Sequence, residues 1–164
     1  LVEQFPDGGP FPKVRQAFET IAMAKVATSA KEAKKFGYLR AQDNYTIDRE
    51  KLIFEAKAKV LGLAKDYIPP TPREDILLPG HGGQLALVDG AAAFHKKGLI
   101  SDYDLELAKT VAHVLAGGDK PTIHPTSEQH ILDLEREAFL KLCGQPKTQG
   151  RMQYMLMTGK PLRN

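Results

Sequence analysis

Residues 134–161 read LEREAFLKLCGQPKTQGRMQYMLMTGKP, and this closing stretch says most about the fold of the chain. Its apolar residues recur at three- and four-residue intervals, which places them on one face of a helix. Gly144 and Pro146 interrupt the pattern and Gly159 ends it. We therefore predict one helix from Thr126 or Ser127 to Gly144 and another from about residue 148 to Gly159. The inner face of the first comprises Ile131, Leu134, Ala138 and Leu142, with Phe139 beside them.

The same helical spacing continues toward the N-terminus, and no alternating apolar–polar run of strand length interrupts it. Prolines and glycines mark residues 1–12 as an irregular lead-in and residues 68–83 as a loop or linker. The sequence therefore predicts an all-α fold of about six to seven helices. The remaining helices are predicted at about 13–25, 29–37, 48–66, 84–97 and 101–117.

Most of the predicted helices carry an apolar stripe that we expect to be buried. Methionines at helical spacing also usually belong to a core, so we expect Met152, Met155 and Met157 to be buried. Four of the five earlier helices, all but the short one at 29–37, have such a stripe: Val14, Phe18, Ile21 and Ala22; Leu52, Ile53, Ala56, Val60 and Leu63; Leu87, Ala91 and Phe94; and Leu105, Ala108, Val111, Ala112 and Leu115.

The composition is that of a folded globular protein, with 42% hydrophobic and 26% charged residues in a chain of 164. Lys and Arg alternate with Asp and Glu, as in residues 31–35, so the net charge of +3 predicts solvated helix faces rather than a nucleic-acid interface. No stretch approaches the roughly 20 apolar residues that span a bilayer. A single cysteine, Cys143, excludes an internal disulfide and predicts a cytoplasmic location.

The side chains that carry chemistry have structural explanations. Three serines fall at predicted helix starts, where a hydroxyl caps free backbone N–H groups; they are Ser29, Ser101 and Ser127. Ser29 with Glu32, and Ser101 with Asp104, have the capping-box spacing, and Asp48 is a further N-cap. We therefore predict no catalytic serine.

The candidate metal, thiol and phosphate sites also have structural explanations. The five histidines show no zinc-motif spacing, so we predict no metal site, and we expect His113 to be hydrogen-bonded and partly buried. Cys143 is expected to be a small core residue. Residues 80–83, Gly-His-Gly-Gly, lack both the Rossmann glycine spacing and a Walker Lys-Ser/Thr, so a flexible turn is favoured over a phosphate site.

Two segments resemble the C-terminal part of enoyl-CoA hydratase-like (crotonase) domains. Residues 28–39 look like the helix that follows the catalytic core in that family, and residues 135–161 match its closing pattern, with Phe139 and Met152 in place. With residues 18–26 and 115–118, the whole chain is similar to the C-terminal end of long bacterial 3-hydroxyacyl-CoA dehydrogenases, which carry an N-terminal NAD-binding dehydrogenase and a C-terminal hydratase-like domain.

The resemblance implies that residues 1–67 and 127–164 are crotonase C-terminal helices and that residues 68–126 are an added helical segment. The chain begins at Leu1 rather than Met, and in the family the catalytic residues and the NAD site precede this segment. We therefore expect the C-terminal part of a fatty-acid β-oxidation enzyme, which serves as a helical cap and oligomerisation region. The missing N-terminal domains would bind NAD and the acyl-CoA substrate, and the fragment would be inactive alone and hold no cofactor of its own.

The resemblance also implies two coenzyme A contacts. Phe139 matches an aromatic residue that lies near the CoA adenine in crotonases, although a plain core position explains it equally well. The lysine that meets the CoA phosphate in the family falls at Thr158, so Lys160 is a possible substitute. A free-standing helical interaction module and a nucleic-acid-binding domain are the alternatives. We also expect the isolated chain to self-associate through uncovered apolar faces.

Overall fold

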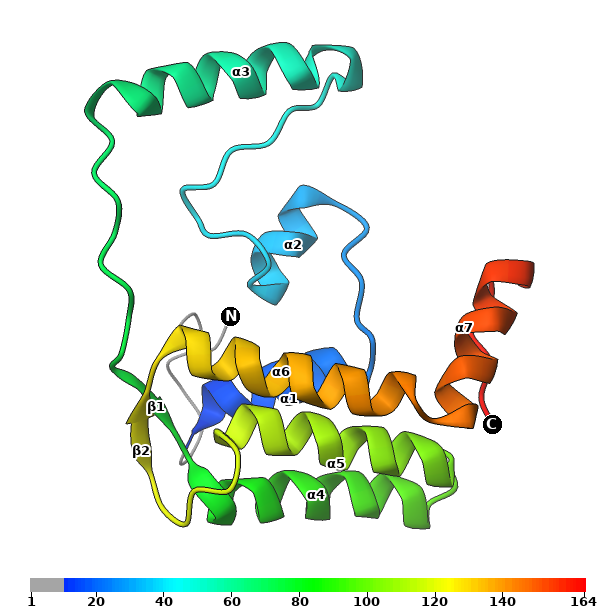
Figure 1. The fold of residues 1–164 in the computed structure, drawn as a ribbon. Helices are drawn as coiled ribbons and strands as arrows, with labels where there is room; N and C mark the ends of the chain where they lie inside the picture. The colour runs from blue at the N-terminus through cyan, green and yellow to red at the C-terminus, as the bar shows by residue number, and fades with distance from the viewer. Residues whose placement is uncertain (1–10) are drawn as a thin grey trace. The chain divides into compact units, whose positions relative to one another are not determined.

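The computed structural model describes residues 11–164, and these form seven α-helices and one small sheet (Figure 1). The predicted all-α class is confirmed; most of the lead-in predicted at residues 1–12 lies outside the described residues. The helices are α1 (Pro12–Ala22), α2 (Ala30–Phe36), α3 (Leu52–Leu63), α4 (Gly80–Lys96), α5 (Asp102–Ala116), α6 (Glu128–Cys143) and α7 (Pro146–Thr158), and the strands are β1 (Ile76–Leu78) and β2 (His124–Thr126).

The chain divides into two compact units. The smaller unit is residues 26–72, and the larger unit combines the segment before it with residues 73–164. The predicted boundaries at residues 67 and 126 separate family-like segments from an added segment, and they do not describe compact units. That predicted division stays a prediction.

The core of the larger unit lies where α1 and α4 pack against α5. Figure 1 shows α4 and α5 side by side, with α6 running along α5. Small alanines on α5 let the neighbouring helices approach closely, and Ala112 is 0% exposed. The core cluster comprises Val14, Phe18, Leu87, Ala91, Ala108 and Ala112.

Most predicted stripes of the larger unit are confirmed. Leu105, Val111 and Leu115 pack at the edge of the core. On α6 the predicted inner face is half-buried, and α5 is the helix that it contacts most. Three predicted positions were wrong: Ile21, Ala22 and Phe94, each in the last turn of its helix, are exposed. On α1, Ala17 and Thr20 are buried instead.

The predicted helix caps are confirmed. The hydroxyls of Ser29, Ser101 and Ser127 each accept a hydrogen bond from the first turn of their helix, and Ser101 with Asp104 forms the full reciprocal box. The box predicted at Ser29 is only half formed. The Glu32 carboxylate accepts from the N–H and hydroxyl of Thr28, both at 2.7 Å, instead of from the Ser29 N–H. Thr28 lies one residue further out and offers two donors to the same oxygen.

The predicted loop at residues 68–83 was partly wrong. Residues 76–78 pair antiparallel with residues 124–126, with Leu77 opposite Pro125. Strands of three residues are too short for the alternating pattern that identifies a strand in a sequence. Helix α4 also begins at Gly80, earlier than predicted.

Gly80 lies in a close backbone contact rather than in a flexible turn. Its φ of +65° suits glycine, and a Cβ there would lie 2.4 Å from the carbonyl oxygen of Thr122. The next N–H, that of His81, donates to the carbonyl of Lys120 at 2.8 Å. This contact ties the start of α4 to the segment before β2, so the flexible turn predicted at residues 80–83 was wrong.

The smaller unit confirms its predicted helices but not their burial. Asp48 caps a 3₁₀ turn that leads into α3, and Gly37 ends α2 with a φ of +79°. However, residues 47–75 are all exposed, so the described part of this unit buries no face of α3. The predicted buried stripe of Leu52, Ile53, Ala56, Val60 and Leu63 was therefore wrong within this chain.

The methionines of α7 were also wrongly placed in a core. Met152, Met155 and Met157 are 48%, 45% and 77% exposed. The side-chain hydrogen bonds between α7 and α5 come from Thr148 and Arg151, which precede all three methionines. None of the helices within residues 11–164 has the length and apolar character needed to cross a membrane.

Candidate functional site

The start of α5 holds the most extensive polar network among the described residues, which we call the α5–α7 cluster: Ser101, Asp104, Arg151 and Asn164. The Arg151 guanidinium donates to the Asp104 carboxylate at 2.7 Å and to the Asn164 side-chain oxygen at 2.8 Å. The Ser101 hydroxyl donates to the main-chain oxygen of Asn164 at 3.2 Å. The side chains of Arg151 and Asp104 are each 20% exposed, so this ion pair is partly shielded from water.

The cluster sets the charge state of Asp104. Burial favours the neutral acid, but the hydrogen bonds that the carboxylate accepts from the Ser101 N–H and from Arg151 outweigh it. The pKa of Asp104 therefore lies below its ordinary value, and the ionised carboxylate contributes to the docking of α7.

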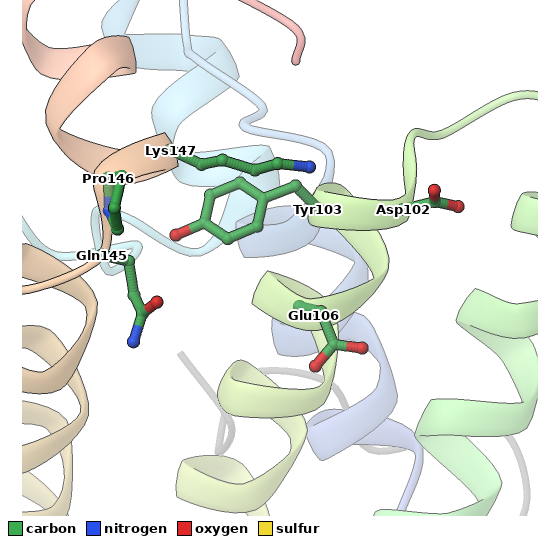
Figure 2. A pocket seen from close by; sticks show the side chains of 6 residues that line it. All are labelled: Asp102, Tyr103, Glu106, Gln145, Pro146 and Lys147. Carbon is green, nitrogen blue, oxygen red and sulfur yellow. The ribbon is translucent and has the colours of Figure 1, made fainter.

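A surface hollow of about 380 Å³ lies beside the cluster, lined by Asp102, Tyr103, Glu106, Gln145, Pro146 and Lys147. Figure 2 shows the Lys147 side chain extended alongside the Tyr103 ring, with the ammonium nitrogen 5.5 Å from the ring centroid. Arg151 also lies over that ring, at 5.1 Å.

The two carboxylates that line the hollow already have partners. Asp102 is hydrogen-bonded to His95 at 2.7 Å, and Glu106 accepts from Lys109 at 2.6 Å, so both carboxylates are already paired. None of the six lining residues is a serine, cysteine or histidine that would act as a nucleophile or base. The geometry explains how α7 is held on α5.

The two residues predicted to contact CoA lie on different elements. Phe139 is on α6 and is 61% exposed, so the plain core interpretation of this residue was wrong within this chain. Lys160 is exposed beyond the end of α7, separated from α6 by the full length of that helix, about 20 Å. Thr158, at the family's lysine position, donates its hydroxyl to the carbonyl of Tyr154. The CoA contacts of Phe139 and Lys160 stay predictions.

The remaining candidates are structural. His113 is half-buried, as predicted, and its Nδ1 lies 3.6 Å from the Asp119 carboxylate, which is too far for a hydrogen bond, so the predicted hydrogen bond of His113 stays a prediction. Cys143 is half-buried at the end of α6. Within residues 11–164, no group of three or more His, Cys, Asp or Glu side chains is placed to hold a metal ion.

Sequence reasoning missed the α5–α7 cluster. Asp104 and Arg151 are 47 residues apart, and neither lies in a motif that indicates the other. A half-buried arginine just before the exposed methionines of α7 has no distinctive pattern in a single sequence.

Comparison with known proteins gives one informative likeness. The chain is 41% identical over 155 residues to a protein of Bacillus subtilis (strain 168) described as "Probable 3-hydroxyacyl-CoA dehydrogenase". The match covers 94% of this chain and 20% of the relative, so the chain spans about a fifth of the relative's length. No family model matches the chain, and no solved structure matches it.

Proposed function

We propose that this chain is a non-catalytic helical part of a fatty-acid β-oxidation enzyme of the 3-hydroxyacyl-CoA dehydrogenase kind. The identity of 41% over 94% of the chain carries the proposal. The reaction, NAD-dependent oxidation of a 3-hydroxyacyl-CoA with or without hydration of a 2-enoyl-CoA, would be performed by other polypeptide, in the cytoplasm.

NAD does not fit the glycine-rich residues 80–83 at the start of α4. At residues 80–83 the His81 N–H is bonded to Lys120, and backbone oxygens lie within 3 Å of where a Gly80 Cβ would be. A pyrophosphate needs free N–H groups and open space at that position. The proposal therefore places the NAD site outside this chain.

Within the proposed enzyme the chain would act as a cap and oligomerisation region. Large apolar side chains are exposed on α3, α6 and α7, among them Phe54, Leu140 and Leu156 at 75%, 65% and 87%. Water contact with so much apolar surface is unfavourable and marks shared interfaces. Phe139 and Lys160 would lie near a CoA bound by the other domains.

The test adds this chain in trans to the Bacillus relative from which the matching 155-residue segment has been deleted. We expect the chain alone to form no NADH from a 3-hydroxyacyl-CoA, and the deleted relative to be impaired. Adding the chain should restore much of the lost rate. A chain that turns over substrate by itself would contradict the proposal, as would a folded deletion protein that it neither binds nor activates.

The docking of α7 gives a second prediction. Asp104→Asn should lower the free energy of unfolding by about 1–2 kcal/mol at pH 7, because the ion pair and the charged cap are lost. The folded-state pKa of Asp104 is depressed, so this stabilisation is complete above the ordinary aspartate pKa of about 4 and is lost as the pH falls through the folded-state value.

Urea unfolding at several pH values measures this difference. The gap between the native chain and Asp104→Asn should be constant near neutrality and shrink below about pH 4. Asp89→Asn, at an exposed position of α4, is the control and should change stability little. A gap that does not depend on pH would show that the Asp104 charge contributes nothing.

A further inference from the structure

Helix α7 is attached to the larger unit without belonging to its core. All of its residues are described, none of them is buried, and none belongs to the core cluster. Its apolar side chains stay in contact with water, with Leu156 87% and Met157 77% exposed. Segments that make few buried apolar contacts open at a lower free energy than the core does. We therefore expect α7 to leave its place more readily than α1, α4 or α5 unfold.

Polar contacts from residues 147–151 hold α7 on α5. The Arg151 guanidinium donates to the Asp104 carboxylate at 2.7 Å, and the hydroxyls of Thr148 and Tyr103 are hydrogen-bonded to each other. Lys147 and Arg151 both lie over the Tyr103 ring, which is only 8% exposed. Each of these contacts is made by side chains. They can therefore break while the backbone hydrogen bonds within both helices stay intact.

The connection between α6 and α7 is a two-residue hinge. Gly144 and Gln145 separate Cys143, the last residue of α6, from Pro146, the first residue of α7. Gln145 is extended, with φ −87° and ψ 130°, and a residue before proline avoids the helical region, so the two helices do not merge into one. A Cβ on Gly144 would have the carbonyl oxygen of Lys141 as its nearest neighbour, at an ordinary contact distance of 3.5 Å. Packing at Gly144 therefore leaves the hinge room to turn.

Residues 160–164 fold back along α7. The Asn164 side chain accepts a hydrogen bond from Arg151 at 2.8 Å and donates one to the main-chain oxygen of Lys147 at 3.3 Å. The Ser101 hydroxyl, at the start of α5, donates to the main-chain oxygen of Asn164 at 3.2 Å. Movement of α7 away from α5 would break this last bond together with the side-chain contacts described above.

We propose that residues 146–164 form an arm that leaves its seat on α5 and returns to it as one unit, while the core of the larger unit stays folded. The seat comprises Ser101, Tyr103 and Asp104. Opening the arm uncovers the Tyr103 ring and removes the guanidinium from the Asp104 carboxylate. The closed arm keeps any other helix off this seat, so it is an internal cover of a polar docking surface on α5. This inference stands on the geometry of the larger unit and does not depend on the proposed function.

Amide hydrogen exchange, followed by nuclear magnetic resonance in increasing urea, tests this on the full chain. A detached helix of 13 residues is marginal in water, so the amides of α7 exchange when the arm opens. We expect the amides of residues 150–158 to exchange at similar rates, at least roughly tenfold faster than those near Ala112. Their exchange should depend little on urea, because opening exposes little surface, whereas the core amides should follow global unfolding.

Variants of the contacts test what holds the arm. Arg151→Gln removes the charge that binds Asp104 and should speed exchange throughout α7 at least roughly tenfold. Arg136→Gln is the matched control, because Arg136 on α6 forms an exposed ion pair with Asp133, and it should change the exchange of α7 by less than about threefold. Thr148→Val removes the other hydrogen bond to α5 and gives the same comparison if circular dichroism shows that Arg151→Gln is unfolded.

Three results would overturn the inference. Equal exchange rates and equal urea dependence for α7 and α5 would show that α7 detaches only when the core unfolds. Rates that rise steadily toward Thr158 would assign the exchange to fraying of the helix end. Exchange of α7 that neither Arg151→Gln nor Thr148→Val speeds would show that these contacts do not hold the arm. None of these results bears on the proposed function, which the experiment in trans tests separately.

Discussion

Ala112→Asp should prevent the larger unit from folding. Ala112 is 0% exposed in the cluster where α1, α4 and α5 meet, and no polar side chain belongs to that cluster. A carboxylate there must lose its hydration or remain protonated, at a cost of several kcal/mol. The total stability of a domain is only about 5–15 kcal/mol, so this one change removes much or all of it. Far-ultraviolet circular dichroism against temperature measures the loss.

Ala93→Asp is the matched control, because Ala93 is an exposed alanine of α4. Both variants bear the small helix-propensity cost of aspartate, less than about 1 kcal/mol, and only Ala112→Asp buries the charge. We expect Ala93→Asp to melt within a few degrees of the native chain. If the two variants melted alike, the helix packing described for the larger unit would be wrong.

Gly80→Ala should lower the free energy of unfolding by about 3 kcal/mol. Alanine at a φ of +65° costs about 1–2 kcal/mol by itself. Its Cβ would also lie 2.4 Å from the carbonyl oxygen of Thr122 and 2.8 Å from that of Lys120. These are main-chain atoms that cannot rotate away, so α4 or the segment before β2 must shift. The hydrogen bond from His81 to Lys120 would be strained by the same shift.

Urea unfolding of Gly80→Ala beside Gly90→Ala isolates this contact. Gly90 lies within α4, and no heavy atom is within 4 Å of a Cβ built there. Alanine favours helix over glycine, so Gly90→Ala should be more stable than the native chain by about 0.5–1 kcal/mol. Equal effects at the two positions would contradict the close approach at Gly80.

Features that depend on a few neighbouring residues were predictable from the sequence. A serine with an acidic residue three positions on identified the start of α5, and Gly37 and Gly159 identified helix ends, because these signals act through adjacent backbone groups. The stripe of α5 was predictable for the same reason, since its period is set by the helix. Strand β1 was not, because its partner lies 48 positions away in register and each strand has only three residues.

The predictions of buried residues failed where the surface that would cover them is not in the described structure. The stripe of α3 and the methionines of α7 have the spacing of core residues, yet Ile53 and Met157 are 82% and 77% exposed. Helical spacing states that a face is apolar and does not state which polypeptide covers it. The proposed function accounts for both errors, because the covering surface would belong to the rest of the enzyme.

The candidate site was less predictable than the fold. The Asp104–Arg151 pair depends on how α7 returns to α5, which no local pattern specifies. Phe139 and Lys160 were predicted from the resemblance to crotonases. They lie on different elements, so their predicted contacts with coenzyme A need an experiment. Phe139→Ala and Lys160→Ala in the assembled enzyme are the direct probes of that role.

A chimera tests the central claim most directly. In it, this chain's matching 155 residues replace the corresponding segment of the Bacillus relative. The account predicts a folded enzyme that oxidises 3-hydroxyacyl-CoA with NAD at a rate within about tenfold of the relative's own, a change in activation free energy below about 1.4 kcal/mol. A chimera that folds but has lost the relative's activity would contradict the assignment of this chain to such an enzyme.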